Sequence, residues 1–251
     1  MIFFHNIAAL FLLSFILRMK NIKETIYEKY PKHYLAVDCV IFGYEESELK
    51  VLLYPRGFEP SRGKWSLMGG FVNTDESLDQ AVLRVLEQTV GLNNIYLEQV
   101  AGFSEPDRDP GGRVVSMAYY ALIPIDKQDK ELVRNHGAHW WPITKLPALI
   151  FDHEKMIQVS LERLQHKASL ELVGKDLLPD LFTLSMLLNL YNAIFQRKFD
   201  AGNFRKKIAT IKMLEQTPLK ETDSSKRGAY YFKFRKNNKQ VSIDRIVKLA
   251  R

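Results

Sequence analysis

Residues 70–92 are spaced as a segment that binds a metal ion for catalysis would be. The apolar residues of this segment recur at helical spacing, so the side chains at positions 85, 88 and 89 share one helix face. Three carboxylates there would bind magnesium or manganese, which neutralises phosphate charge and activates water. The chain instead has Val85, Gln88 and Thr89. Glu87 cannot replace them, because it lies roughly 200° round the helix from position 85. We therefore predict no catalytic residue, no metal ion and no cofactor.

The residues around these positions keep the spacing of a Nudix box. The matching residues are Gly70, Glu76, Arg84, Leu86, Gly91 and Leu92. The chain thus resembles a Nudix hydrolase domain whose metal-binding glutamates are missing, which implies a binding domain rather than an enzyme. With no catalytic base to orient, Glu76 and Arg84 are expected to form an ion pair between loop and helix. A residual hydrolase with unusual ligands is the alternative.

Length and charge indicate two modest domains or one large one. The 251 residues carry a net charge of +7. Residues 175–251 contain 17 Lys and Arg against 7 Asp and Glu, whereas residues 1–174 contain 19 against 22. This asymmetry predicts that the second part of the chain meets a polyanion. The one cysteine, Cys39, excludes an internal disulfide and suits a reducing cytoplasm. It lies in an apolar run and is expected in the core.

Residues 1–18 form an apolar leader whose charges follow it rather than precede it, unlike those of a signal peptide. The apolar stretch is also short for a membrane-spanning helix, which needs about 20 residues. Three interpretations are open: an overlong reading frame whose true start is Met19, a membrane anchor, or a helix packed on the body. We expect a cytoplasmic protein without a membrane partner.

Residues 19–170 predict an α/β sandwich. Two apolar, β-branched runs read as a hairpin, and the Nudix-box helix follows them. Later segments predict two more strands, a short edge element and a final helix. The strand and edge segments are 34–42, 49–54, 98–103, 114–122 and 140–142, and the final helix spans 152–164.

Residues 175–251 predict a winged helix-turn-helix domain. Pro179 marks its boundary, and Thr183 is a good N-cap for an apolar helix reaching Phe195. A turn at 199–202 precedes a basic helix over 203–214. Two strands, 219–221 and 229–234, are joined by a basic loop and form the wing.

The positive charge of this domain favours binding to double-stranded DNA. The expected contact residues are Asn203, Arg205, Lys206, Lys207, Lys212, Lys226 and Arg227. RNA binding is the main rival, but the aromatic runs expected for base stacking on a sheet are missing. A basic run on a helix is often only a solvated face, and the winged context is what favours DNA here.

Over residues 20–251 the chain resembles the Nudix-related transcriptional regulators, whose best-known members control NAD biosynthesis and bind ADP-ribose. The resemblance rests on the altered Nudix box, on Asp107–Ser116, on Phe151–His153, and on residues 182–208. A Bacteroidetes branch that controls arabinose catabolism looks closer still. The resemblance implies a homodimeric repressor that binds pseudo-palindromic operators.

The expected effector is a small neutral polyol, L-arabinose, with ADP-ribose and NAD metabolism as the alternative. Gly111 follows Pro110 where relatives that hold ADP-ribose place a basic residue, and Met68 replaces a proline before the double glycine. The candidate effector-binding residues, by motif position, are Trp65, Glu105, Asp107, Arg113, Trp140, Asp152 and His153. Structural roles are open for three of them: sheet-edge packing for Trp140, a helix N-cap for Asp152 and a loop salt bridge for Arg113.

Overall fold

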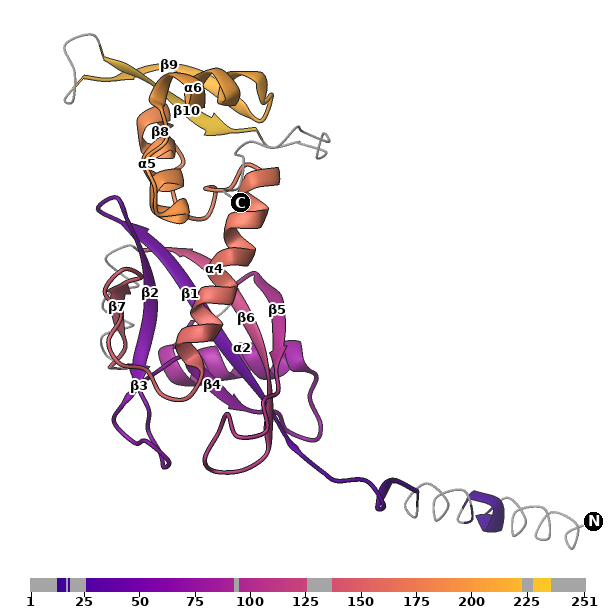
Figure 1. The fold of residues 1–251 in the computed structure, drawn as a ribbon. Coiled ribbons are helices and arrows are strands. Elements are labelled where there is room, and N and C mark those ends of the chain that lie inside the picture. Colours follow the sequence, from indigo (N-terminus) through magenta and orange to yellow (C-terminus); the bar gives the residue numbers. More distant parts are fainter. Residues whose placement is uncertain are drawn as a thin grey trace, which may run out of the picture. The chain divides into compact units, whose positions relative to one another are not determined.

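The computed structural model describes residues 13–16, 18, 26–92, 95–125, 137–222 and 228–235 (Figure 1). Two compact units are present, Met1–Tyr34 and Leu35–Arg251. In the first, the helical residues 13–16 are exposed, with 62% of Phe15 accessible to solvent. In the described ranges, no helix combines the length and apolar character needed to cross a membrane. Met19 and most of the leader lie outside the described residues.

A seven-stranded sheet forms the centre of the second unit. Its main order is β3-β2-β1-β6-β5, while β4 pairs with β1 and β7 pairs with β2. The strands are β1 (Tyr34–Glu45), β2 (Glu48–Pro55), β3 (Trp65–Ser66), β4 (Met68–Phe71), β5 (Leu97–Phe103), β6 (Val114–Pro124) and β7 (His139–Pro142). The predicted hairpin is confirmed: β1 and β2 are antiparallel, and Glu46 and Ser47 turn the chain with positive φ angles.

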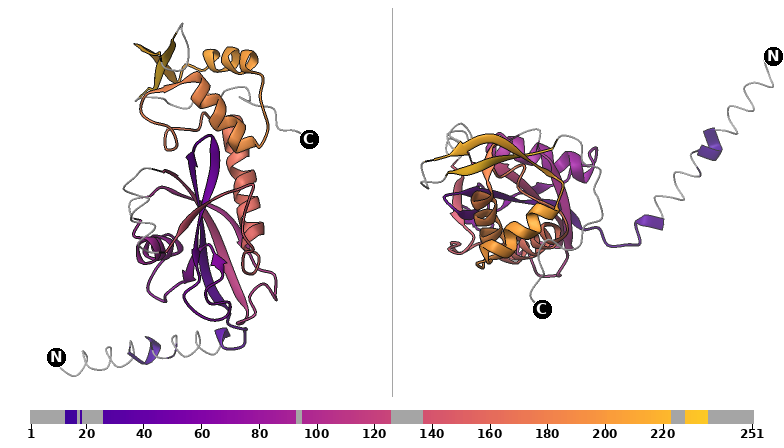
Figure 2. Two further views of the ribbon diagram at one scale, coloured as in Figure 1. Left: turned by 90° about the vertical axis from the view of Figure 1, so that its left-hand side faces the viewer. Right: turned by 90° about the horizontal axis from the view of Figure 1, so that it is seen from above.

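Two helices cover opposite faces of this sheet, as Figure 2 shows. Because side chains alternate along a strand, β1 places Cys39 and Ile41 on the side of α2 (Leu78–Val90), and Val40 and Phe42 on the side of α4 (His153–Leu170). Each face therefore has its own apolar core. The core position predicted for Cys39 is confirmed, and burial raises the pKa of its thiol.

Helix α2 begins and ends where its sequence dictates. The Ser77 hydroxyl accepts the Gln80 backbone N–H, the Gln80 side chain accepts the Ser77 N–H, and Gly91 closes the helix in the left-handed conformation. Helix α4 extends beyond its predicted end at Leu164, because its last two turns still bury Ala168 and Ser169.

The C-terminal domain is a winged helix. Its elements are β8 (Phe182–Thr183), α5 (Leu184–Phe195), α6 (Ala201–Thr210), β9 (Leu214–Glu221) and β10 (Ala229–Phe234), and the sheet order is β8-β10-β9. Thr183 caps α5 as predicted, since its hydroxyl accepts the Met186 N–H. The rings of Tyr191, Phe195, Phe199 and Phe204 pack against one another between the two helices.

Two boundaries in this domain differ from the prediction. Helix α6 begins after Asp200, whose carboxylate accepts the Asn203 N–H, and it ends at Thr210 rather than at residue 214. Lys212 therefore lies in the turn after α6 and not on the helix. Strand β9 starts earlier than predicted, at Leu214, because an edge strand tolerates Pro218 at an irregularity in the pairing with β10.

Candidate functional site

The ion pair predicted between Glu76 and Arg84 is present. Arg84 donates from Nε to Glu76 Oε2 at 2.9 Å and from Nη2 to Glu76 Oε1 at 2.5 Å, and it also donates to the carbonyl of Phe71. Glu76 in turn accepts the N–H of Asn73. The Arg84 hydrogen bonds, assisted by Asn73, lower the pKa of Glu76 to about 2. The pair therefore joins the loop before α2 to the helix.

The three positions that lack carboxylates are occupied by side chains with internal partners. Val85 is 3% exposed and packs so closely on Gly70 that a Cβ there would lie 2.8 Å from Val85 Cγ2. The Thr89 hydroxyl donates to the Val85 carbonyl at 2.6 Å. The Gln88 side chain accepts from Arg84 at 3.4 Å. These residues do not fit the divalent ion of a Nudix hydrolase, and the described residues contain no other group of three His, Cys, Asp or Glu side chains that could hold a metal ion.

A small cavity lies beside the double glycine of β4. Its volume is about 30 Å³, room for about one water molecule. A Cβ at Gly69 would collide with Asp38, so only glycine lets the β4 backbone approach the cavity floor. Its other lining residues come from the start of β1, the segment after β2, strand β3, the end of β4, the loop before β6 with the first residue of that strand, and the start of α4.

The floor of this cavity is a buried polar network. Arg108 donates from Nε and Nη2 to the two carboxylate oxygens of Asp152, at 2.9 and 2.7 Å. Its Nη2 also lies 3.8 Å from Asp38, and the Ser116 hydroxyl donates to Asp38 at 2.6 Å. Burial alone would lower the pKa of Arg108, but the hydrogen bond to Asp152 and the charges of Asp152, Asp38 and Asp109 raise it. Arg108 therefore stays charged and joins β1 to α4.

His153 completes the network. Its Nδ1 accepts the backbone N–H of Leu67 at 3.0 Å, so in the neutral ring Nε2 carries the hydrogen, 3.7 Å from Asp38 Oδ1. Burial lowers the pKa of His153, although Asp38 and Asp152 oppose the shift. The network therefore combines a neutral imidazole with two carboxylates and one guanidinium.

The mouth of the cavity presents a cation between aromatic rings. The Arg56 guanidinium lies 3.9 Å from the ring centroid of Phe58 and 5.2 Å from that of Phe151. Phe58 and Phe71 are each 46% exposed at this opening. A ligand with a flat ring and a negative group would find both partners here.

Of the seven candidate effector residues, His153 lines this cavity and Asp152 binds Arg108, which lines it. Asp152 occupies the N-cap position of α4 without a side-chain capping bond. Arg113 makes no salt bridge with a described residue; it donates to the carbonyls of Ser104 and Glu105. Asp107 is exposed in the loop before β6.

The two tryptophans lie outside this lining. Trp65 packs edge-on against His139 and Trp141 on β7, and Trp140 packs on the α2-side core. Sequence reasoning did not single out Asp38, Arg56, Phe58 or Arg108. Arg108 lies within the Asp107–Ser116 motif, but only the fold shows that the side chain of this arginine is buried in the cavity floor.

On the winged helix, α6 exposes a polar face. Asn203, Arg205 and Lys206 are exposed, Lys207 is half-buried, and Phe204 and Ile208 face the core. Arg205 Nη2 lies within hydrogen-bond distance, 3.3 Å, of the Ser185 hydroxyl at the start of α5. Lys226 and Arg227 of the wing lie outside the described residues.

Two family models match the chain. The NUDIX domain matches residues 32–160, and the NrtR DNA-binding winged helix domain matches residues 174–234. A relative from Acinetobacter baylyi, described as an ADPR responsive transcriptional repressor, NtrR, is 31% identical over 230 residues, 88% of this chain and 90% of that protein.

Two further comparisons agree with this pattern. The crystal structure of Shewanella oneidensis NrtR complexed with a 27mer DNA has a TM-score of 0.69 and 33% identity, covering 80% of this chain and 93% of that chain. An ADP-ribose pyrophosphatase from Methanocaldococcus jannaschii is 34% identical over 139 residues, 55% of this chain and 81% of that protein. The chain therefore belongs to the NrtR-type family of transcriptional regulators, in which a Nudix domain precedes a DNA-binding winged helix domain.

Proposed function

We propose that this protein is a repressor that binds operator DNA through its winged helix and releases it when ADP-ribose binds the Nudix domain. The observation that carries the proposal is the cavity mouth, where Arg56 lies between Phe58 and Phe151 beside a Nudix helix that lacks metal carboxylates. The rings suit a purine, and the guanidinium suits a diphosphate. The Acinetobacter baylyi relative, described as ADPR responsive, supports this choice.

The expectation of L-arabinose finds no support in the comparisons, which favour its alternative, ADP-ribose. The missing basic residue at Gly111 led to the sugar prediction. In the fold, Arg56, the residue after β2, brings positive charge to the cavity mouth, while Arg108 on the cavity floor is bound to Asp152. The cavity therefore does not lack partners for an anion.

We propose residues 19–170 as the sensor and 175–251 as the DNA-binding part of a cytoplasmic homodimer. A C2 dimer presents two α6 helices to the two halves of a pseudo-palindrome. ADP-ribose then acts by preferring a dimer arrangement that mis-spaces these helices, which requires different affinities for the two arrangements. Coupling of this kind typically changes affinity about 5- to 150-fold.

Fluorescence anisotropy with labelled operator DNA tests the choice of effector. ADP-ribose is expected to weaken DNA binding at least about 5-fold, and L-arabinose to leave it unchanged. Arg56→Gln is expected to abolish the ADP-ribose effect while DNA affinity without effector stays the same. Arg62→Gln, in the same loop but outside the cavity lining, is the matched control. Release by L-arabinose and not by ADP-ribose would reverse the assignment.

We further propose that the Nudix domain binds ADP-ribose without hydrolysing it. With magnesium or manganese, the purified protein is expected to release no product from ADP-ribose, because positions 85, 88 and 89 offer no carboxylate. Chromatography of the nucleotide after long incubation measures this. Turnover that disappears in Glu76→Gln would establish a residual hydrolase instead.

A further inference from the structure

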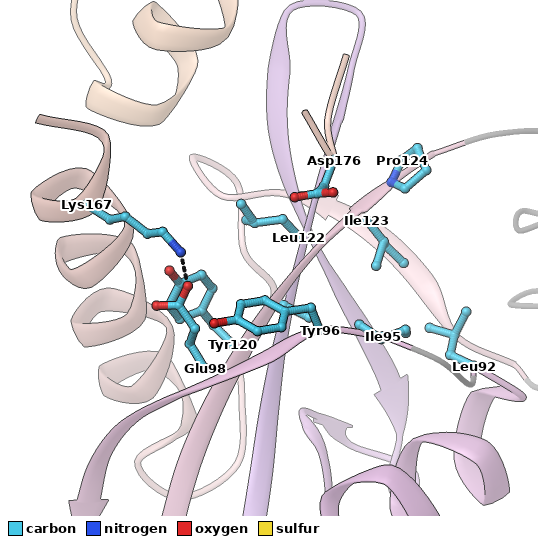
Figure 3. A pocket seen from close by; sticks show the side chains of 11 residues that line it. Leu92, Ile95, Tyr96, Glu98, Tyr120, Leu122, Ile123, Pro124, Lys167 and Asp176 are labelled. Atoms are coloured by element: carbon cyan, nitrogen blue, oxygen red, sulfur yellow. Dashed lines mark hydrogen bonds and ion pairs between the residues drawn. The ribbon is translucent and has the colours of Figure 1, made fainter. Parts of the chain in front are cut away.

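A second cavity, of about 420 Å³, lies where β6 extends past the start of β5 (Figure 3). Leu97, the first residue of β5, pairs with Ala121, so the last three residues of β6 have no β5 partner. Residues of α4 and of the segment joining α4 to β8 close the space. This cavity shares no lining residue with the one beside Gly69. Its volume falls in the range of small-molecule sites, about 300–1,000 Å³.

One wall of this second cavity is aliphatic. Its residues come from the end of β6 and from the segment before β5: Leu92, Ile95, Leu122, Ile123 and Pro124. Such a wall suits the apolar body of a ligand, since burying apolar surface is favourable by about 25 cal/mol per Å².

The opposite end is polar, and its charges are unequal. Lys167 Nζ forms an ion pair with Glu98 and lies 5.8 Å from the ring centroid of Tyr96. The Tyr120 hydroxyl lies beside these groups, and burial followed by the charge of Glu98 raises the pKa of Tyr120, so this hydroxyl stays protonated. Asp176 is exposed at the rim, and no described side chain pairs with it.

Among the described residues that line the cavity, the charges therefore sum to one carboxylate. Lys167 is the one cation among these described lining residues, and it is paired with Glu98. Arg163 and His166 lie in the adjoining groove along α4 and do not line the cavity. A phosphate or carboxylate ligand would meet net negative charge here, whereas an ammonium group would meet the carboxylate of Asp176.

We propose that this cavity binds a small organic cation with an apolar ring or chain and one ammonium group. The apolar body lies against the end of β6, and the ammonium group lies towards Asp176. The proposal is independent of ADP-ribose, because the two cavities share no lining residue.

Isothermal titration of the full chain with three probes of similar shape tests the charge preference. These are 2-phenylethylamine, 2-phenylethanol and phenylacetate, which are cationic, neutral and anionic at pH 7. The amine is expected to bind most tightly and phenylacetate most weakly. Equal binding of amine and phenylacetate, or no heat from the amine at millimolar concentration, would overturn the proposal.

Substitutions at Asp176 test the location, and Asp180 is the matched control because it is exposed in the same segment but does not line the cavity. Asp176→Asn is expected to weaken amine binding about 2- to 5-fold, as for an exposed ion pair. Asp176→Lys is expected to reverse the preference towards phenylacetate, and Asp180→Lys to leave it unchanged. Identical behaviour of the Asp176 and Asp180 variants would refute the site.

Discussion

The carboxylate of Glu76 is tied both to a side chain and to the backbone, and so its protonation state is coupled to folding. Its folded-state pKa of about 2 lies below the value of about 4.3 for an unfolded chain. The group therefore contributes stability that is fully present above the unfolded-state pKa and is lost as the pH falls through the folded-state value.

We expect Glu76→Gln to lower the free energy of unfolding at pH 7 and to make little difference near pH 2. Urea unfolding of the wild type and the variant between pH 7 and pH 2 measures the difference between their free energies of unfolding. Glu87→Gln, on the exposed face of α2, serves as the control and should show no such convergence. A gap that stays constant down to pH 2 would show that the pair is not linked to protonation.

His153 has a structural role: its Nδ1 atom accepts the hydrogen bond of a buried backbone N–H. Replacement by Leu leaves the buried Leu67 N–H without its acceptor and is expected to cost about 1–3 kcal/mol. Asn is expected to cost less, because its side-chain oxygen can take the position of Nδ1. Equilibrium unfolding of both variants decides this; equal losses would mean that packing rather than the hydrogen bond sets the effect.

Protonation of His153 gives a second readout, in a higher pH window than that of Glu76. Because its pKa is lowered in the fold, the unfolded chain takes up the proton first as the pH falls below about 6.5. Stability should therefore be full above pH 6.5 and decline below it. This decline is expected to be smaller in His153→Asn than in the wild type.

At the scale of secondary-structure elements, the most accurate predictions were those that rested on short-range sequence signals. The β1–β2 hairpin and α2 follow from alternation, periodicity and a Ser77 capping box, all of which are local. The predicted C-terminal end of α4 and the predicted start of α6 were wrong, because burial of Ala168 and N-capping by Asp200 depend on neighbours and loop geometry. The Arg108–Asp152 pair could not be predicted, since the two residues are distant in sequence and meet only through the fold.

Helix α6 is the element on which DNA recognition is expected to depend. Lys206 is exposed on it, and Lys206→Ala should weaken binding to all sequences and reduce the salt slope by about one unit if it contacts a phosphate. Arg205→Ala should instead cost about 1–3 kcal/mol on the operator and relax specificity if it reads a base. Anisotropy titrations across salt concentrations separate the two roles.

Lys198 provides the matched control for these variants, because it is an exposed lysine of the same domain that precedes α6. Lys198→Ala should leave the salt slope nearly unchanged. If neither the Lys206 nor the Arg205 variant differs from this control, α6 is not the helix that enters the groove.

At the scale of the whole molecule, ADP-ribose and operator DNA should each weaken the binding of the other by the same factor. If ADP-ribose weakens DNA binding by a given factor, operator DNA must weaken ADP-ribose binding by the same factor. Isothermal titration of ADP-ribose with and without saturating operator measures this. The same ADP-ribose affinity in both titrations would exclude allosteric release, even if both ligands bind.

Gly70 packs closely on Val85, and Glu76 is hydrogen-bonded to Arg84. Natural selection can keep these residues for a structural reason unrelated to turnover. A gene that drifts from enzyme to sensor can therefore retain its recognisable signature for as long as the protein must fold. In genome surveys, the glycine, glutamate and arginine then report ancestry. We expect the residues corresponding to 85, 88 and 89, rather than this frame, to distinguish hydrolases from domains that only bind.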